Sequence, residues 1–217
     1  MGTNDWYGSF GHNSSFDIRP YYSKEFCKRI GIWSSQRIKK EKLTFLISAG
    51  FGAVKSRERR GSILALKAFT KVKGECQLLV YSQIKYADCL LSWRNIIESD
   101  NRIIFIEGTH DPFPYNKGDI YVYPSRLDGI GLTVPEALSC GLPVIATNNP
   151  PMNEFVFDGV NGQLVDVSSF IARSDGYYWA QSICDSNLLA NAMQSYVSQP
   201  NLAITHGQAA RVFAENN

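Results

Sequence analysis

The segment PSRLDGIGLTVPEALSCGLPVIAT, residues 124–147, carries most of the information about the fold. A glycine-rich turn, Gly129-Ile130-Gly131, separates a strand-like apolar end from a run of small and apolar residues with helical spacing. Pro135 is tolerated in a helix only within the first turn, so the helix is predicted to begin near Leu132. A second apolar run, LPVIAT, follows at 142–147. The segment therefore predicts a strand, a turn, a helix and a second strand.

The same alternation of apolar runs and helical segments continues on both sides of this unit. Strands are predicted at 44–50, 77–82, 102–108, 119–125, 142–147 and 162–165. Helices are predicted within 56–72 and at 86–98, 132–140, 187–198 and 201–216. Continuous apolar strands joined by helices are typical of a parallel sheet that is covered on both faces. The predicted fold class is therefore α/β, with a parallel sheet of about six strands.

The composition fits one sizeable domain or two small ones within 217 residues. No apolar run is long enough to span a bilayer, and the polar first residues, MGTNDWYGSF, do not resemble a signal peptide. The five cysteines are scattered, odd in number and never in a CxxC pair, which argues for reduced thiols and against zinc or disulfides. We therefore expect a cytoplasmic protein without a transmembrane segment, able to lie at a membrane surface.

Basic residues are concentrated in the first 73 residues, which hold 15 Lys/Arg and 5 Asp/Glu, whereas the remainder holds 7 and 15. This asymmetry favours an anionic ligand or partner near the N-terminal third, although RIKKEK at 37–42 is better explained as a solvated linker. Nucleic acid is not expected as a partner, because the basic region lacks a nucleic-acid-binding motif. We predict an N-terminal linker or extension at 1–42 and one domain at 43–217.

Several common nucleotide and metal motifs are incomplete. AGFGAVK at 49–55 begins like a dinucleotide fingerprint, but Lys55 replaces the third glycine and no acid closes the second strand. A P-loop GxxxxGK[ST] and an Asp-x-Asp pair are both absent from the sequence. His12, His110 and His206 lack metal-ligand spacing and are interpreted as surface or cap residues. These patterns argue against a dehydrogenase, a P-loop kinase and a metal-dependent nucleotide-sugar enzyme.

From Pro124 onward the sequence resembles the group-1 type of retaining glycosyltransferases, which have the GT-B fold. In that family an acid-x7-acid motif follows a Pro-Ser strand end, and a Pro-Val-Ile-Ala-Thr strand and a Glu-x3-Asp-Gly-x2-Gly segment come next. The matching acids and glycines here are Asp128, Glu136, Glu154, Asp158, Gly159 and Gly162. Weaker similarity extends over 44–125 and the terminal helices. The resemblance implies a Rossmann-like domain, which is the donor-binding half of a GT-B enzyme.

The chemistry of the turn agrees with that resemblance. Glycines at 129 and 131 allow the backbone to approach a phosphate, and the amides of Ile130, Gly131, Leu132 and Thr133 would bind an anion without a metal. Glu136 would accept hydrogen bonds from a ribose diol, and Asp128 would meet hydroxyl groups of the donor sugar, as the resemblance also implies. The alternative is structural: Asp128 caps the helix and Glu136 interacts favourably with its dipole.

A basic loop precedes the first predicted helix. The resemblance implies an Arg directly after the first strand and a Lys-Gly pair before the helix, both on the donor phosphates. Phe51 stands at the first position and Arg60-Gly61 at the second, where arginine can bind phosphate in a bidentate manner. Lys55, Arg57 or Arg59 could replace the missing Arg, and the sequence does not choose among them. The alternative is a loop that is only solvated.

Other candidate contacts lie on neighbouring loops. The resemblance implies that 82–86 and 107–111, which includes Thr109, hold the base and ribose. It also places Glu154, with Asn148 and Asn149, near the sugar. Three aromatic residues of the insertion at 170–181, Tyr177, Tyr178 and Trp179, are expected to pack on the sheet edge rather than to bind carbohydrate.

The resemblance implies transfer of a sugar, with retention, from a UDP- or GDP-sugar to an acceptor that is a glycan or glycolipid. No metal cofactor is expected, since backbone amides and basic side chains would stabilise the leaving diphosphate. The acceptor site would belong to an N-terminal domain or a partner chain, which residues 1–42 cannot provide. The alternative function is a non-catalytic module that binds nucleotide sugars or serves as a scaffold.

Overall fold

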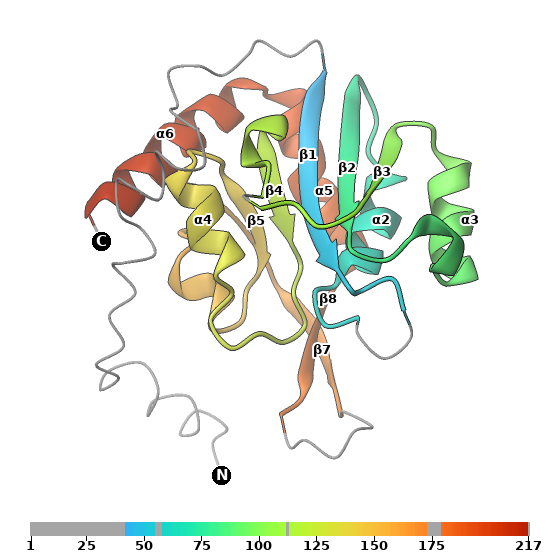
Figure 1. Ribbon diagram of the computed structural model, residues 1–217. Helices are drawn as coiled ribbons and strands as arrows, with labels where there is room; N and C mark the ends of the chain where they lie inside the picture. Colours follow the sequence, from blue (N-terminus) through green and yellow to red (C-terminus); the bar gives the residue numbers. More distant parts are fainter. Residues whose placement is uncertain (1–41, 55–57, 112, 173–178, 217) are drawn as a thin grey trace.

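The computed structural model describes residues 42–54, 58–111, 113–172 and 179–216 (Figure 1). Six parallel strands form one sheet in the order β3-β2-β1-β4-β5-β6. The strands are β1 (Leu43–Gly50), β2 (Cys76–Ser82), β3 (Ile103–Glu107), β4 (Ile120–Tyr123), β5 (Val144–Thr147) and β6 (Gly162–Val165). All six predicted strands are confirmed. The order reverses between β1 and β4, and ligands of doubly wound sheets bind beyond the carboxyl ends of the strands at such a point.

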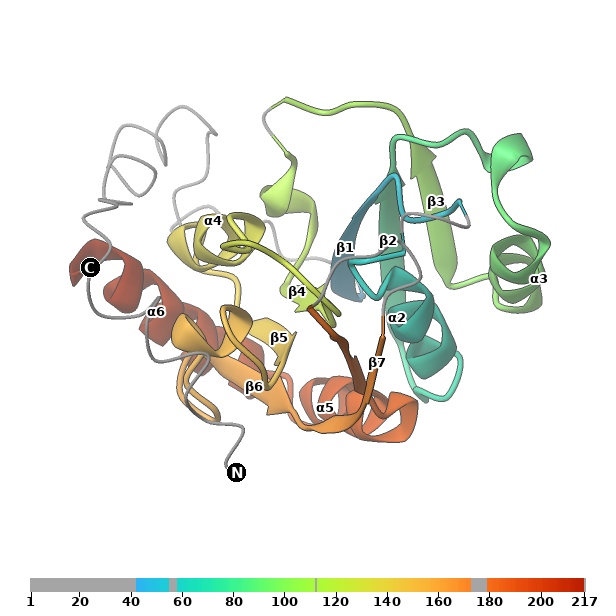
Figure 2. The same ribbon diagram turned by 90° about the horizontal axis from the view of Figure 1, so that it is seen from below.

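Helices cover both faces of the sheet, as predicted (Figure 2). The helices are α2 (Ser62–Phe69), α3 (Leu91–Ser99), α4 (Thr133–Ser139), α5 (Ser186–Ser198) and α6 (Asn201–Asn216). Along β1, Phe45 and Ile47 pack with α2, α3 and α5, whereas Leu46 packs with α4 and α6. Since alternate side chains of a strand point to opposite faces, the apolar runs of β1, β2, β4 and β5 are buried on both faces of the sheet.

Two details of the predicted helices and histidines are wrong. The helix predicted at 86–98 is a single 3₁₀ turn, η3 (Tyr86–Asp88), followed by α3, because Cys89 and Leu90 have extended backbone conformations between them. His206, interpreted as a surface or cap residue, is buried in α6, where its Nδ1 lies 2.9 Å from the hydroxyl of Tyr196. The apolar period of α6 places this side chain on its inner face.

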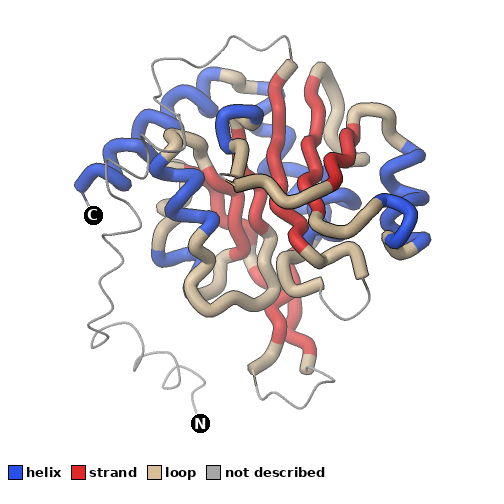
Figure 3. The backbone as a smooth tube through the Cα atoms, in the orientation of Figure 1, coloured by secondary structure: helices blue, strands red, loops and turns tan. Residues whose placement is uncertain are grey.

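A two-stranded antiparallel hairpin interrupts the sequence between β6 and α5. It consists of β7 (Val167–Ile171) and β8 (Gln181–Cys184) and extends beyond the carboxyl ends of the main sheet (Figure 3). Trp179 is 60% exposed, so its expected packing on the sheet edge is wrong. Tyr177 and Tyr178 lie outside the described residues.

The first 41 residues, together with Lys55 and Arg57, also lie outside the described part of the chain. The division of the protein at residue 42 therefore stays a prediction. The four cysteines within the described ranges are buried, and none of them forms a disulfide with another described cysteine. Among the helices that the structure describes, none is long and apolar enough to cross a membrane.

Candidate functional site

The glycine turn (residues 126–131) is shaped by its own acid, Asp128. The Oδ1 atom of Asp128 accepts hydrogen bonds from the amides of Gly129, at 2.7 Å, and Gly131, at 3.1 Å. The Oδ2 atom accepts a hydrogen bond from the hydroxyl of Tyr123. The amide of Gly131, expected to face an anion, is therefore already engaged. Asp128 does not cap α4 as the structural alternative supposed, since the N-cap of α4 is Leu132 and no side-chain cap hydrogen bond is present there. A carboxylate can accept about four hydrogen bonds, so one more donor can still reach Asp128.

Glu136 lies in α4, one helical turn after its start, and its carboxylate faces the inner side of the helix. Its Oε2 accepts a hydrogen bond of 2.6 Å from the hydroxyl of Tyr115, which is fully buried. Burial raises the pKa of Glu136 above its usual value, although the Tyr115 bond and the charge of Arg60 act in the opposite direction. Burial also holds the pKa of Tyr115 well above its usual range. The phenol is therefore a neutral donor that orients the carboxylate.

A row of tyrosines supports both acids, and the sequence analysis missed it. Tyr121 and Tyr123 stack with ring centroids 5.9 Å apart, and Tyr115 meets Tyr121 edge-on at 5.7 Å. The signal was present in the strand IYVY, because alternation places both of its tyrosines on the same face. This face of the sheet packs against α4, and the hydroxyl groups of Tyr123 and Tyr115 donate hydrogen bonds to Asp128 and Glu136, respectively.

Arg60 reaches the same edge of the sheet from the arginine loop (residues 58–61). Its Nη1 donates to the hydroxyl of Ser48, at 2.9 Å, and to the carbonyl of Ser48, at 3.2 Å. All hydrogen bonds of this side chain to described residues come from Nη1. A guanidinium has five N–H donors, so most of them remain available for a ligand.

Gly61 explains why arginine and glycine occur together here. Its φ of 66° is left-handed, and a Cβ atom at this position would lie 1.8 Å from the carbonyl oxygen of Pro124. Only glycine permits this approach, which packs the arginine loop against the end of β4. The close contact fixes the backbone next to Arg60.

A hollow of about 150 Å³ opens at the carboxyl ends of β1, β2 and β3. It is lined by Ser48, Gly50, Arg60, Tyr81, Ser82, Gln83, Gly108, Thr109, His110, Phe113 and Thr133. Three predicted site residues from distant segments, Arg60, Thr109 and Thr133, therefore share one hollow. Asp128 and Glu136 accept hydrogen bonds from tyrosines of the row described above, and neither acid is part of the lining of the hollow.

The predicted sugar contacts after β5 are not brought into this hollow. Glu154 is an exposed residue at the end of a 3₁₀ turn, η5 (Met152–Glu154). The amide nitrogen of the Asn148 side chain donates to Asp166, and that of Asn149 donates to the carbonyl of Pro150. These groups would need to exchange partners before they could bind a sugar.

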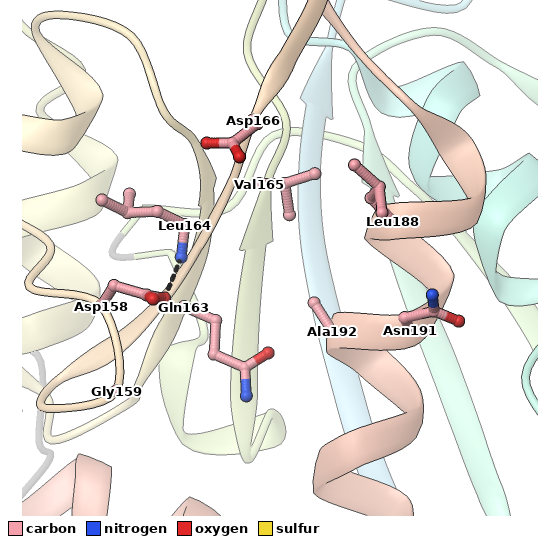
Figure 4. A pocket seen from close by; sticks show the side chains of 9 residues that line it. All are labelled: Asp158, Gly159, Gln163, Leu164, Val165, Asp166, Leu188, Asn191 and Ala192. Atoms are coloured by element: carbon pink, nitrogen blue, oxygen red, sulfur yellow. Dashed lines mark hydrogen bonds between the residues drawn. The ribbon is translucent and has the colours of Figure 1, made fainter.

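A larger hollow, of about 410 Å³, lies between β6 and α5 (Figure 4). Its carboxylates already have partners: Asp158 accepts from the amide of Leu164 at 2.9 Å, and Asp166 accepts from Asn148 at 2.9 Å. The remaining lining includes apolar side chains such as Leu188 and Ala192. The smaller hollow gathers the predicted contacts, so it is the better candidate site.

Glu58, at the start of the arginine loop, is a second feature that sequence analysis missed. Its Oε1 accepts a hydrogen bond of 3.2 Å from the amide of Ile63, at the start of α2. Its Oε2 is buried without a hydrogen-bond partner among the described residues. Burial raises the pKa of Glu58 to about 7, and the charge of Arg126 opposes this shift.

Comparison with known proteins identifies the family. A family model for glycosyl transferases group 1 matches residues 48–175, which is more than half of the chain. The chain belongs to this family. The glycosyl transferase match covers the arginine loop, the glycine turn and both acids of the acid-x7-acid motif.

Individual relatives share shorter stretches with this glycosyl transferase chain. It is 32% identical over 111 residues to the lipopolysaccharide core biosynthesis mannosyltransferase LpcC of Rhizobium leguminosarum, covering 51% of this chain and 27% of that protein. It is 39% identical over 72 residues to sucrose synthase 6 of Arabidopsis thaliana, covering 28% of this chain and 8% of that protein. The chain therefore spans less than a third of the length of either relative.

Solved structures share the fold at low identity. Sucrose-phosphate synthase from Thermosynechococcus elongatus superposes with a TM-score of 0.63 at 22% identity, covering 84% of this chain and 43% of that one. The C-terminal domain of a group 1 glycosyl transferase, LpcC, from Francisella tularensis gives 0.59 at 21% identity, covering 85% and 90%. These matches confirm the predicted Rossmann-like α/β fold.

Proposed function

We propose that this chain supplies the nucleotide-sugar-binding domain of a retaining glycosyltransferase. The donor is a UDP- or GDP-sugar, the acceptor is a glycan or glycolipid, and the setting is cytoplasmic. The observation that carries the proposal is the hollow where Arg60, Thr109 and Thr133 meet at the reversal of strand order. Family membership supports it, as does the fold shared with Anabaena HepE, whose structure was solved with UDP and glucose.

In this proposal Arg60 binds the donor diphosphate, together with the amides of Ile130, Leu132 and Thr133. During transfer the bond between the anomeric carbon and the diphosphate oxygen breaks, and its electron pair leaves with the diphosphate. A bond to the acceptor oxygen forms, and the proton of the acceptor hydroxyl passes to the departing diphosphate oxygen. The guanidinium is already held at Ser48 before the donor binds, so it can stabilise the growing negative charge without rearranging. The proposal therefore needs no metal ion.

The remaining predicted residues orient the nucleoside and the sugar. Thr109 faces the base and ribose from the loop after β3, beside Gln83, whose side-chain amide lies 3.4 Å from its hydroxyl. Glu136 accepts from the ribose diol with the carboxylate oxygen that Tyr115 leaves available. Asp128 shapes the turn and offers its last acceptor position to the sugar, and Glu154 approaches the sugar only after the loop adjusts.

The test is nucleotide binding to the wild-type chain and to Arg60→Ala. Isothermal titration with UDP, GDP, ADP and their sugars should identify at least one ligand. Loss of a charged hydrogen-bond donor costs about 1.5–3 kcal/mol of binding free energy, so Arg60→Ala should lower the affinity for this ligand by roughly 10- to 100-fold. The control is Lys67→Ala, which removes one positive charge at an exposed position in the last turn of α2. Absence of binding to every nucleotide, or equal losses in both variants, would contradict the proposal.

A non-catalytic binding module is the second candidate, and Phe51 favours it. This residue stands where the resemblance implies a phosphate-binding arginine, and its side chain is 46% exposed. Nucleotide-sugar binding without transfer, measured with an acceptor-binding half supplied by a relative, would favour this function. Transfer with an unchanged anomeric configuration, read by NMR of the product, would favour the retaining enzyme.

A further inference from the structure

Arg126 connects three segments that are distant in the sequence. It lies in the glycine turn, between the end of β4 and Asp128. Its amide donates a hydrogen bond of 2.7 Å to the carbonyl of Arg59 in the arginine loop. Its own carbonyl accepts two hydrogen bonds from Ser182 in β8, one from the amide at 2.8 Å and one from the hydroxyl at 3.1 Å. The arginine loop, the glycine turn and the hairpin are therefore joined through one residue.

These contacts determine where Arg60 can be. The residue before it, Arg59, is held by Arg126, and its carbonyl also lies 3.4 Å from the hydroxyl of Ser125. The residue after it, Gly61, packs against Pro124 at a distance that excludes a Cβ atom. Both neighbours of Arg60 are thus fixed to the end of β4, and the position of that end decides where the guanidinium lies.

The hairpin in turn holds the glycine turn. Ser182 is 1% exposed, whereas the residues of β7 are mostly exposed, so the hairpin is attached to the domain through β8. Both donors of Ser182 are directed at the single carbonyl of Arg126, which has two lone pairs to accept them. These two hydrogen bonds are not part of the β7–β8 ladder, and they join the hairpin to the glycine turn.

We propose that Ser182 is a positioning residue, through which the hairpin places Arg60 against the donor diphosphate. The proposal rests on the proposed function, because it requires that Arg60 bind the diphosphate. Ser182 does not touch the ligand. It acts through Arg126 and Arg59. Without its hydrogen bonds the arginine loop can shift away from the position in which Arg60 binds the diphosphate, and a displacement of about 1 Å is enough to lower activity strongly.

The test compares variants of Ser182 with a matched serine in the same hairpin. Ser182→Ala removes the hydroxyl bond to Arg126, and Ser182→Pro also removes the amide donor, which points away from β7. The control is Ser168→Ala, whose hydroxyl donates to the carbonyl of Ile183 at 2.8 Å within the hairpin. The probes are UDP and GDP, with uridine and guanosine as the ligands that lack the diphosphate, measured by NMR titration.

We expect Ser182→Ala to lower the affinity for UDP or GDP about fivefold, which corresponds to the loss of one neutral hydrogen bond. Ser182→Pro should lower this affinity further. Nucleoside affinity should stay unchanged, and Ser168→Ala should match the wild type. In an Arg60→Ala background, Ser182→Ala should have no further effect, since the positioned group is absent. A purely structural role would instead lower the affinity of nucleoside and diphosphate alike.

Two results separate this inference from the proposed function. If the wild type binds UDP or GDP and Ser182→Ala binds it equally well, the positioning role is wrong and the proposed function stands. Additive losses in the double variant would also overturn the inference. If the wild type binds neither nucleotide, the proposed function fails, and the positioning role fails with it.

Discussion

The arginine loop and the glycine turn frame the same site but are held in place by different means. The arginine loop is fixed by its neighbours: Gly61 packs against Pro124, and Arg59 bonds to Arg126. The glycine turn is held at Arg126 by Ser182 and also has support from within, because Asp128 accepts hydrogen bonds from two of its own amides. One loop depends on fit to the rest of the domain, whereas the other carries its own support and leaves open space around its backbone.

The same contrast appears in the acids of the two loops. Asp128 has three donors, including the hydroxyl of Tyr123, and both of its oxygens are satisfied. Glu58 has one donor, the amide of Ile63, and one buried oxygen without a described partner. A carboxylate with donors on both oxygens holds the geometry of its loop, whereas a buried carboxylate oxygen without a donor favours the protonated form. The arginine loop therefore contains a carboxylate, Glu58, whose titration should make the stability of the protein depend on pH.

The largest expected effect is that of Gly61→Ala, which breaks the fit of the arginine loop. The new Cβ would lie 1.8 Å from the carbonyl oxygen of Pro124, at a backbone φ of 66°. Overpacking and left-handed strain together should lower the free energy of unfolding by more than about 3 kcal/mol, measured by urea denaturation. Nucleotide affinity should fall with it, because Arg60 is displaced.

Gly159→Ala is the matched control for this prediction. Gly159 has a φ of 71°, but a Cβ atom there would meet nothing within 4 Å. Its substitution carries the backbone cost alone, which is about 1 kcal/mol. Equal losses in the two variants would show that the contact between Gly61 and Pro124 is not what holds the arginine loop.

The second effect is a pH dependence of stability that Glu58→Gln should remove. The pKa of Glu58 is raised in the folded protein to about 7, from 4.5 in a solvated chain. The folded state therefore binds the proton more tightly, so stability falls as pH rises from about 4.5 to 7 and is constant above that. The difference in unfolding free energy between Glu58→Gln and wild type should grow by about 3 kcal/mol in favour of the variant across this range.

Urea denaturation between pH 4.5 and pH 8 measures this difference. Glu75→Gln is the control, since it makes the same charge change at a side chain that is 86% exposed. If the difference between Glu58→Gln and wild type were the same at both ends of the range, the buried carboxylate would not titrate as the structure indicates.

Much of the fold was predictable because each main strand is a short, continuous apolar run. The runs at β1, β2 and β5 are buried on both faces, and their short length and apolar continuity are typical of strands in a covered sheet. The β7–β8 hairpin was missed because VSSFI and QSIC are short and polar, so neither shows an apolar period. Their attachment to the domain includes the contact of Ser182 with Arg126, which joins segments 56 residues apart and leaves no local signal in the sequence.

The candidate site was predictable only in part, for a similar reason. The family resemblance implied Arg60 and Thr109 as donor contacts, the glycine turn implied the amide of Thr133, and the structure gathers the three residues in one hollow. Spacing could not show that Asp128 is engaged with its own turn, because that contact depends on backbone conformation. The buried oxygen of Glu58 was equally invisible, since burial there results from how the arginine loop packs on the sheet.

Gly129→Ala is expected to have the smallest effect on stability. The same variant tests directly whether the glycine turn binds the diphosphate. The φ of Gly129 is not positive, and a Cβ atom there would meet nothing within 4 Å. Its unfolding free energy should stay within about 0.5 kcal/mol of the wild type. If the diphosphate approaches this backbone as proposed, the added methyl group occupies its place, and affinity for UDP or GDP should fall at least roughly tenfold while nucleoside affinity is kept. Unchanged diphosphate affinity in a variant of normal stability would mean that the open space beside the glycine turn is not where the phosphates lie, and that Arg60 binds them without the amides of this turn.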